Sequence, residues 1–178
     1  VTDANGCQSV PNTVAVTEPS PITAMTSSTD ITCNGMDDGT ATAFATGGTV
    51  AGFYTYVWTA SGGGVVLPGQ ANNVSLSGLT AGIYSCAIID DNACLLTTAS
   101  VSILEPDMIS TVATDVSVSC FGMCDGSISA TSTGGTPPYT YSWSTGQTGS
   151  VVSGICAGIY TYTVTDAIGC TSVPNTVL

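Results

Sequence analysis

The sequence predicts an all-β protein built from two consecutive copies of one β-sandwich domain. Three observations lead to this prediction. The chain contains an internal repeat, its segments alternate apolar and hydroxyl side chains with a period of two, and no segment sustains the 3.6-residue apolar period of a helix. Gly, Asn and Asp residues separate the alternating segments, as expected for turns between strands.

The internal repeat sets the expected domain boundaries. Residues 1–14 (VTDANGCQSVPNTV) match residues 164–177 (VTDAIGCTSVPNTV), and residues 31–48 match residues 118–135 without a gap. Glu-Pro pairs at 18–19 and 105–106 separate the copies. We therefore expect three units, listed in chain order: 1–18, holding the last strands of a preceding repeat, 19–105, the first full repeat, and 106–178, a second repeat with a truncated final strand.

Residues 1–18 allow two interpretations. They are the end of a preceding copy in a window cut from a longer array, or they are a donor strand that completes the sheet of a neighbouring subunit by strand addition. The sequence leaves both open.

The strands of the first copy are justified one by one by their alternation. The segment Gly39-Thr-Ala-Thr-Ala-Phe-Ala45 places small apolar residues on one face and mostly hydroxyls on the other. The expected strands, in chain order, are 22–33, 40–46, 54–60, 73–79, 83–90 and 95–104. About seven such runs per copy, spaced 8–12 residues apart, are typical of an immunoglobulin-like sandwich, so we expect tandem sandwiches in a head-to-tail array.

Four aromatic residues are the expected core anchors. Trp58 and Trp143 lie on the third strand of each copy, where such sandwiches bury a Trp. The segment 79–84 resembles a tyrosine corner. This assigns Tyr84 to the entry of the expected strand 83–90, and Tyr160 to the entry of the equivalent strand in the second copy.

The composition excludes several functions. The 178 residues include twelve Asp and Glu but no Lys, Arg or His, which gives a formal charge of −12. Nucleic acids bind through Lys and Arg, so a nucleic-acid partner is excluded. No apolar run approaches the ~20 residues of a membrane-spanning helix, so direct membrane insertion is not expected. No catalytic residues are expected either, because acid–base and electrostatic catalysis usually use His, Lys or Arg.

Several motifs carry a family resemblance. The segments ITCNGMDDGTAT, GGTPPYTYSWSTGQT and SGICAGIYTYTVTDAIGC resemble SprB-type repeats, which occur in tandem in surface adhesins of gliding and related Bacteroidota. The first copy departs from the pattern after Gly48 and in an expanded turn over 60–69. The resemblance implies surface display, adhesion or filament building, without catalytic residues.

Eight cysteines indicate an oxidising, extracellular compartment. The strand map places Cys124 in the turn between the first two strands of the second copy. It places Cys156 in the turn before the strand that is equivalent to 83–90. These turns share one pole of the sandwich. The equivalent positions of the first copy, Asp37 and Thr80, both lack cysteine. We therefore predict a Cys124–Cys156 disulfide.

The other cysteines lie at opposite poles. Cys33 and Cys120 are expected at the lower pole of their copies, and Cys94, Cys170 and Cys7 at the upper pole. A strand of eight residues spans roughly 25 Å, so head-to-tail stacking favours a Cys33–Cys170 disulfide between domains. Cys120 and Cys94 would then pair with neighbouring copies. Pairs within one copy, Cys33 with Cys94 and Cys120 with Cys170, remain the alternative.

The carboxylates have two interpretations. Asp and Glu in turns keep the surface hydrated and suit tight turns. Calcium is the other interpretation, since it takes several oxygen ligands. Five carboxylates could converge at the junction between the copies: Asp37, Asp38, Glu105, Asp107 and Asp166. No cofactor is required, and calcium is an optional ligand.

The sequence thus predicts a non-enzymatic structural or adhesive module. It would form a stiff, disulfide-reinforced rod on a cell surface or in an extracellular filament, with neighbouring copies of itself as partners. A carbohydrate- or surface-binding module using the expanded turn is the first alternative, with surface glycans as partners. An accessory domain of a large secreted enzyme is the second.

Overall fold

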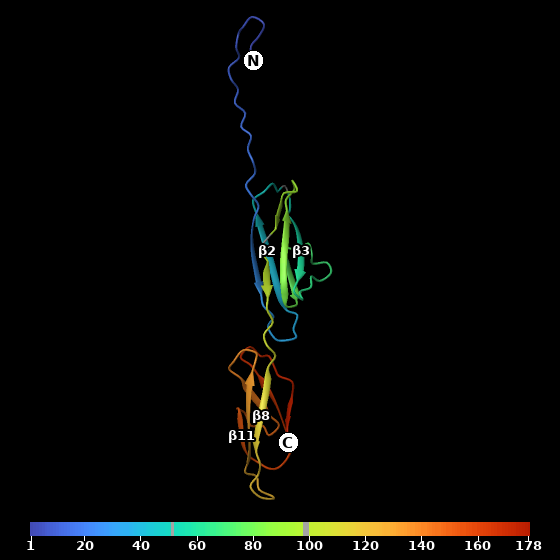
Figure 1. Ribbon diagram of the computed structural model, residues 1–178, viewed down its shortest axis with the longest axis vertical. Coiled ribbons are helices and arrows are strands. Elements are labelled where there is room, and N and C mark those ends of the chain that lie inside the picture. Colours follow the sequence, from blue (N-terminus) through green and yellow to red (C-terminus); the bar gives the residue numbers. More distant parts are fainter. Residues whose placement is uncertain (51, 98–99) are drawn as a thin grey trace.

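The computed structural model describes residues 1–50, 52–97 and 100–178 of the chain. Two all-β sandwiches stand end to end, and an extended N-terminal segment continues the long axis beyond the first one (Figure 1). Within the described residues, no helix is long and apolar enough to cross a membrane. The end-to-end arrangement of the two sandwiches confirms the predicted head-to-tail pair of immunoglobulin-like sandwiches.

In its described residues, the first domain contains seven strands in two antiparallel sheets. One sheet has the order β1-β2-β4, and in the other β5 pairs with β3, β6 and β7. The strands are β1 (Thr23–Thr29), β2 (Gly39–Thr46), β3 (Thr55–Ser61), β4 (Ser75–Leu79), β5 (Gly82–Ile89), β6 (Leu95–Thr97) and β7 (Val101–Ile103).

The second domain repeats this arrangement with six strands. Its sheets have the orders β11-β9-β8 and β10-β12-β13. The strands are β8 (Ser110–Val116), β9 (Gly126–Thr133), β10 (Thr140–Trp143), β11 (Val151–Ile155), β12 (Tyr160–Thr165) and β13 (Asn175–Val177).

Two expected strands of the first domain differ from the observed ones. The predicted strand 22–33 ends at Thr29. Beyond it, the Asp30 carboxylate accepts the N–H of Leu104 (2.8 Å), and the N–H of Thr32 donates to the Asp38 carboxylate (2.9 Å) and not to a neighbouring strand. The predicted strand 95–104 is observed as two short strands, β6 and β7, and its residues 98–99 lie outside the described part of the chain.

The alternation in the sequence places one face of each strand in a core. On β2, Ala41, Ala43 and Ala45 are buried, while Phe44 faces outward. Trp58 and Trp143 are buried in the two cores, and each indole N–H donates to a carbonyl of the following loop, 2.8 Å to Asn73 and 2.9 Å to Gly149. Both tryptophans are therefore core anchors, as the sequence predicted.

The two cores differ beside the tryptophan. Trp143 stacks on Tyr162 with ring centroids 4.4 Å apart. In the first domain Cys86 takes the position of Tyr162, opposite Trp58, and is fully buried. Burial raises the pKa of the Cys86 thiol, so it stays a neutral, apolar group.

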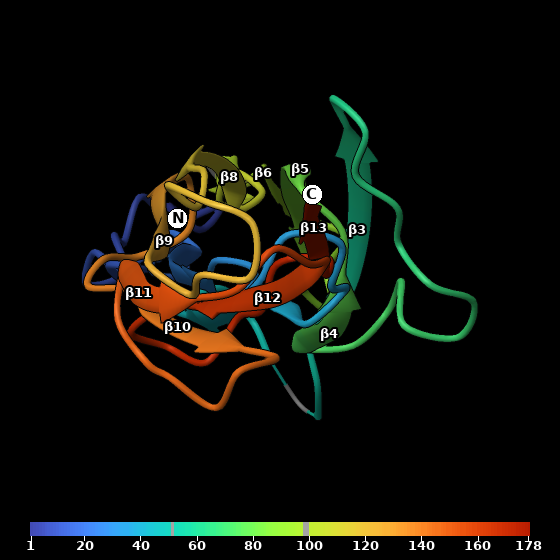
Figure 2. The ribbon, with the colours of Figure 1, turned by 90° about the horizontal axis from the view of Figure 1, so that it is seen from below.

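Both tyrosine corners are present. The Tyr84 hydroxyl donates to the Thr80 carbonyl (2.9 Å), and the Tyr160 hydroxyl donates to the Cys156 carbonyl (2.8 Å). Tyr84 is fully buried and also accepts the N–H of Val65 (3.1 Å), which ties the long loop after β3 to the sandwich. That loop projects from the side of the first domain (Figure 2). Tyr160 is only half-buried.

One aspartate organises the turn after the long central strand of each domain. Asp90 accepts the N–H groups of Asn92 (3.0 Å) and Cys94 (2.8 Å) through Oδ1, and that of Thr49 (2.8 Å) through Oδ2. The N–H of Thr49 lowers the pKa of Asp90 most, and those of Cys94 and Asn92 lower it further, against the raising effect of burial.

Asp166 does the same in the second domain, where it accepts the N–H groups of Ile168, Cys170 and Thr136 at 2.9–3.0 Å. Burial raises the pKa of Asp166, but these backbone donors outweigh it, so the pKa lies below its ordinary value. The ionised carboxylate therefore holds the turn that carries Cys170.

The Tyr84→Phe variant should destabilise the first domain more than Tyr160→Phe destabilises the second. Removing the Tyr84 hydroxyl takes a partly buried hydrogen-bond partner from the Thr80 carbonyl and the Val65 N–H, which costs about 1–3 kcal/mol. Tyr160 is half-buried, so water replaces part of its bond and we expect less than about 1 kcal/mol. Urea unfolding followed by Trp fluorescence measures the loss of stability in each domain. In each experiment the Trp of the other domain is replaced by Phe. Equal losses in the two domains would contradict this prediction.

The Asp166→Asn variant should lower stability at neutral pH and weaken its acid dependence. Because the folded pKa of Asp166 lies below its unfolded value, its contribution is fully present above about pH 4 and is lost as the pH falls through the folded pKa. The urea midpoints of wild type and variant should thus converge in acid. Asp115→Asn, which removes the same charge from an exposed position on β8, is the control and should leave the midpoint at neutral pH unchanged. A difference in urea midpoint between wild type and Asp166→Asn that stays constant from pH 7 to pH 2 would contradict this prediction.

Candidate functional site

The junction between the two domains is covalently closed. Cys33, in the turn after β1, forms a disulfide with Cys170, in the turn after β12, with Cα atoms 5.6 Å apart and a sequence separation of 137. The Cys33 side chain also packs against the core of the second domain. The structure thus contains the predicted disulfide between the domains. The alternative disulfides within one copy, Cys33 with Cys94 and Cys120 with Cys170, are wrong. The two cysteines of each such pair lie at opposite poles of their domain.

Hydrogen bonds fix the linker at this junction. The Asn34 side-chain amide donates to the Pro106 carbonyl (3.0 Å), and the N–H of Gly35 donates to the Glu105 carboxylate (2.6 Å). Gly35 has a φ of +81°, which glycine adopts at low cost. On the other side, the N–H of Gly135 donates to the Asp107 carbonyl (2.8 Å). The Glu-Pro linker is therefore held from both domains.

A second disulfide joins Cys124 and Cys156 at the far pole of the second domain, with Cα atoms 3.8 Å apart. It links the turn before β9 to the turn before β12, which are the two turns that the strand map placed together. The remaining predicted disulfide cysteines, Cys7, Cys94 and Cys120, are exposed and outside any disulfide in this chain. Their predicted partners belong to neighbouring copies.

The expected convergence of five carboxylates is not observed. Within the described residues, no three Asp, Glu or Cys side chains lie close enough to hold a metal ion. Asp38 and Asp166 accept backbone N–H groups instead, and Glu105 accepts that of Gly35. The hydroxyl and backbone N–H of Thr32 lower the pKa of Asp38. These carboxylates support turns, while Asp37 and Asp107 are exposed.

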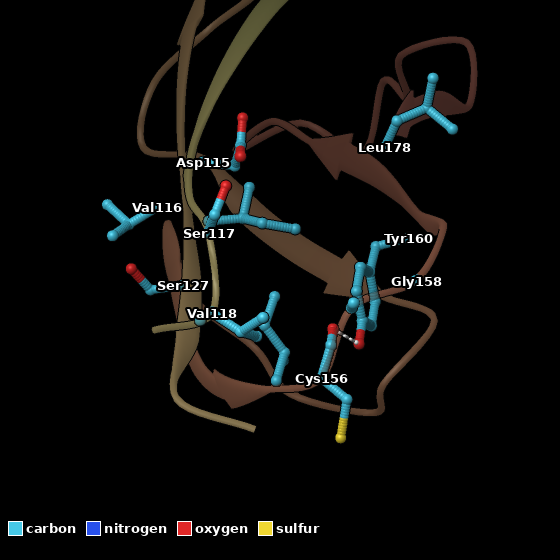
Figure 3. A pocket seen from close by; sticks show the side chains of 13 residues that line it. Asp115, Val116, Ser117, Val118, Ser127, Cys156, Gly158, Tyr160 and Leu178 are labelled. Carbon is cyan, nitrogen blue, oxygen red and sulfur yellow. Dashed lines mark hydrogen bonds between the residues drawn. The ribbon is translucent and has the colours of Figure 1, made fainter. Parts of the chain in front are cut away.

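A pocket of about 220 Å³ opens at the far pole of the second domain. Figure 3 shows Val118, Gly158 and Tyr160 around it, with Cys156 at its rim and Leu178 at the chain end. Gly126, Ile128 and Ile155 complete its apolar wall. The pocket lies at the end of the domain that is opposite to the Cys33–Cys170 junction (Figure 1).

Sequence reasoning singled out neither this pocket nor the turn residues Asn34 and Gly35. Comparison of the two copies does not single out Asn34, because Phe121 stands at the equivalent position of the second copy.

A solved structure shares the fold. Three N-terminal domains of the Highly Immunogenic Outer Capsid protein (Hoc) of bacteriophage RB49 match with a TM-score of 0.50 and 19% identity over 89% of this chain. The chain spans 59% of that structure. A C-terminal fragment of intimin, solved with the intimin-binding domain of its receptor Tir, matches with a TM-score of 0.43 and 16% identity over 90% of this chain and 64% of that one. The search of curated proteins finds no match.

The family comparison identifies the repeat. The SprB repeat model matches residues 25–63 and residues 112–148. Each match starts inside the first strand of a domain and includes the second and third strands, so the two matches occupy equivalent places. Each of the two sandwiches therefore contains a segment that is similar to the SprB repeat.

Proposed function

We propose that this chain is a load-bearing segment of an exported bacterial surface adhesin or filament. Its two domains form a stiff rod, and its role is mechanical and adhesive rather than catalytic. The two SprB repeats support the adhesin context. The disulfides support an oxidising, extracellular location.

The observation that carries this proposal is the covalent junction. A flexible linker between domains normally permits relative motion. Here the Cys33–Cys170 disulfide and the Glu105–Pro106 linker form two parallel connections between the same two domains, and hydrogen bonds from Asn34 and Gly35 fix the linker between them. Two connections at one interface resist both bending and separation along the long axis.

The surface chemistry supports exposure to the medium. The outer faces of the β1-β2-β4 sheet carry hydroxyl pairs, for example Thr23 with Thr46 at 2.9 Å and Thr29 with Thr40 at 2.7 Å. Such pairs hydrate the sheet without charge and add cross-strand bonds. With no Lys or Arg, the chain also offers no site for trypsin-like proteases.

Removing the junction disulfide should make the rod flexible. In the double variant Cys33→Ser/Cys170→Ser, small-angle X-ray scattering should show a broader distribution of particle dimensions with a shorter mean length. Loss of a disulfide that closes so long a loop should also lower the free energy of unfolding by about 2–5 kcal/mol.

The matched control is Cys124→Ser/Cys156→Ser, which removes a disulfide within one domain. It should destabilise the second domain and leave the length distribution of the folded protein unchanged. If the Cys33→Ser/Cys170→Ser protein scatters as the wild type does, the disulfide does not stiffen the rod and the mechanical proposal loses its basis.

Binding to a glycan or another surface is the second candidate function. A hollow of about 520 Å³ beside the long loop of the first domain is lined by Phe53, Tyr54, Tyr56, Asn72 and Asn73. Aromatic rings beside amide side chains give a pocket both an apolar wall and hydrogen-bonding groups. Phe53 is 89% exposed, which leaves its ring available to a ligand.

A glycan array tests this candidate. Specific binding that is reduced about tenfold or more by Phe53→Ala, and retained by Phe121→Ala at the far end of the rod, would support recognition through this hollow. The absence of any specific binding on the array would reject it.

A further inference from the structure

The turn 33–36 at the domain junction contains an Asn-Gly pair. The N–H of Met36 donates to the Cys33 carbonyl (3.0 Å), so Asn34 and Gly35 are the two central residues of this turn. Gly35 has a φ of +81°, a left-handed conformation that glycine adopts at low cost. Asparagine is a chemically labile residue. Glycine after it has no side chain to shield the backbone nitrogen, so this nitrogen can reach the side-chain amide of the asparagine.

The reaction of such a pair is deamidation, and it needs only water. The Gly35 nitrogen gives its proton to hydroxide and attacks the Cγ atom of Asn34. The new N–Cγ bond closes a succinimide ring, the Cγ–Nδ2 bond breaks, and ammonia leaves after taking a proton from water. Water then opens the ring at either carbonyl, which gives aspartate or isoaspartate at position 34. No electrons are transferred to another molecule.

The linker holds both reacting groups of this pair. The Asn34 amide donates to the Pro106 carbonyl (3.0 Å), and the Gly35 N–H donates to the Glu105 carboxylate (2.6 Å). A hydrogen bond to a carboxylate is stronger than one between neutral groups. The negative charge of Glu105 also opposes the formation of a second negative charge on the nitrogen that it contacts. The closed junction should therefore slow deamidation.

Separation of the linker from the turn removes this restraint. Asn34, Gly35 and Glu105 are exposed, so water and hydroxide reach the pair once the two hydrogen bonds are broken. The Gly35 N–H can then lose its proton, and the Asn34 side chain can turn toward the nitrogen. The rate of deamidation thus depends on how often the linker leaves the turn.

The product cannot restore the original contact. An ionised carboxylate at position 34 has no proton to donate to the Pro106 carbonyl. It also adds a negative charge next to the Glu105 carboxylate, and the chain contains no Lys, Arg or His to neutralise it. Isoaspartate in addition inserts a methylene carbon into the main chain of the turn. The modified turn should therefore bind the linker less tightly.

The second copy has the same turn without the asparagine. The N–H of Met123 donates to the Cys120 carbonyl (3.1 Å), and Gly122 has a φ of +83°. Phe121 stands at the position of Asn34. The conformation of the turn therefore does not require asparagine, and the reactive pair belongs to the junction between the two domains.

We propose that Asn34 is a deamidation site whose rate is controlled by the junction: slow while Glu105 and Pro106 hold the turn, and fast once the linker separates from it. Ammonia is lost, so the modified fraction increases with the time that the junction has spent open. The acidic product then weakens the contact between turn and linker. This inference goes beyond the rod function, because it depends on two hydrogen bonds of the turn and not on the stiffness of the whole chain.

The test compares the full 178-residue chain with its Glu105→Ala and Glu18→Ala variants in mildly alkaline buffer. Glu18 belongs to the other Glu-Pro pair, so Glu18→Ala removes the same charge away from the turn 33–36. Both glutamates are exposed, so neither change removes a core contact. Samples are quenched in acid, reduced and digested with pepsin, and mass spectrometry measures aspartate and isoaspartate at position 34.

Deamidation of Asn34 should be about tenfold faster or more in the Glu105→Ala protein, because a charge-assisted hydrogen bond no longer holds the Gly35 N–H. The Glu18→Ala protein should deamidate Asn34 at the rate of the wild type. Asn5-Gly6 is the other Asn-Gly pair of the chain and serves as the internal reference. Its rate should be the same in all three proteins.

The effect of the product is measured on the Asn34→Asp variant. Hydrogen exchange of the Gly35 N–H, followed by nuclear magnetic resonance, should be about threefold faster or more than in the wild type, because one neutral hydrogen bond to the linker is lost. Asn72→Asp adds the same charge at an exposed position in the long loop of the first domain and is the matched control. It should leave this exchange rate unchanged.

Two results would overturn the proposal. The first is deamidation of Asn34 that is equal in the Glu105→Ala and Glu18→Ala proteins, or slower in Glu105→Ala, since the linker would then not protect the pair. The second is exchange of the Gly35 N–H that is equal in the Asn34→Asp and Asn72→Asp proteins. Neither result bears on the rod function, which the scattering of the Cys33→Ser/Cys170→Ser protein decides.

Discussion

The contact between the turn 33–36 of one domain and the turn 166–170 of the next is the interaction on which the arrangement of the chain depends. Asp166 holds the second turn through backbone N–H groups, and this positions Cys170 to meet Cys33. Glu105 and Pro106 accept hydrogen bonds from the first turn, so the linker lies along the contact. Without this contact, a two-residue Glu-Pro linker would join two independent sandwiches.

A chain without Lys, Arg or His must neutralise its carboxylates by other means. Backbone N–H groups take this role at Asp90 and Asp166. At Asp38 and Asp125 the hydroxyls of Thr32 and Ser119 take it together with backbone N–H groups, and all four carboxyl groups have a lowered pKa. Each ionised carboxylate stabilises the turn that donates to it, so acidic residues become structural elements. At the junction, Asp38, Glu105 and Asp166 likewise accept backbone N–H groups.

The repeat gives the two domains the same pair of poles. Each domain presents a turn with a cysteine at one pole and an Asp-held turn with a cysteine at the other. The segment that enters each domain forms the same backbone hydrogen bond in both copies, from Gly48 to Ser20 and from Gly135 to Asp107.

The sequence by itself determined the all-β fold, the repeat, the core positions of Trp58 and Trp143 and the pole at which each cysteine lies, because these follow from local alternation and from self-comparison. Only the tertiary structure decided that Cys33 meets Cys170, since this depends on how two domains stack across a linker. It also decided that β1 ends at Thr29, where the carboxylates of Asp30 and Asp38 compete with the sheet for backbone N–H groups.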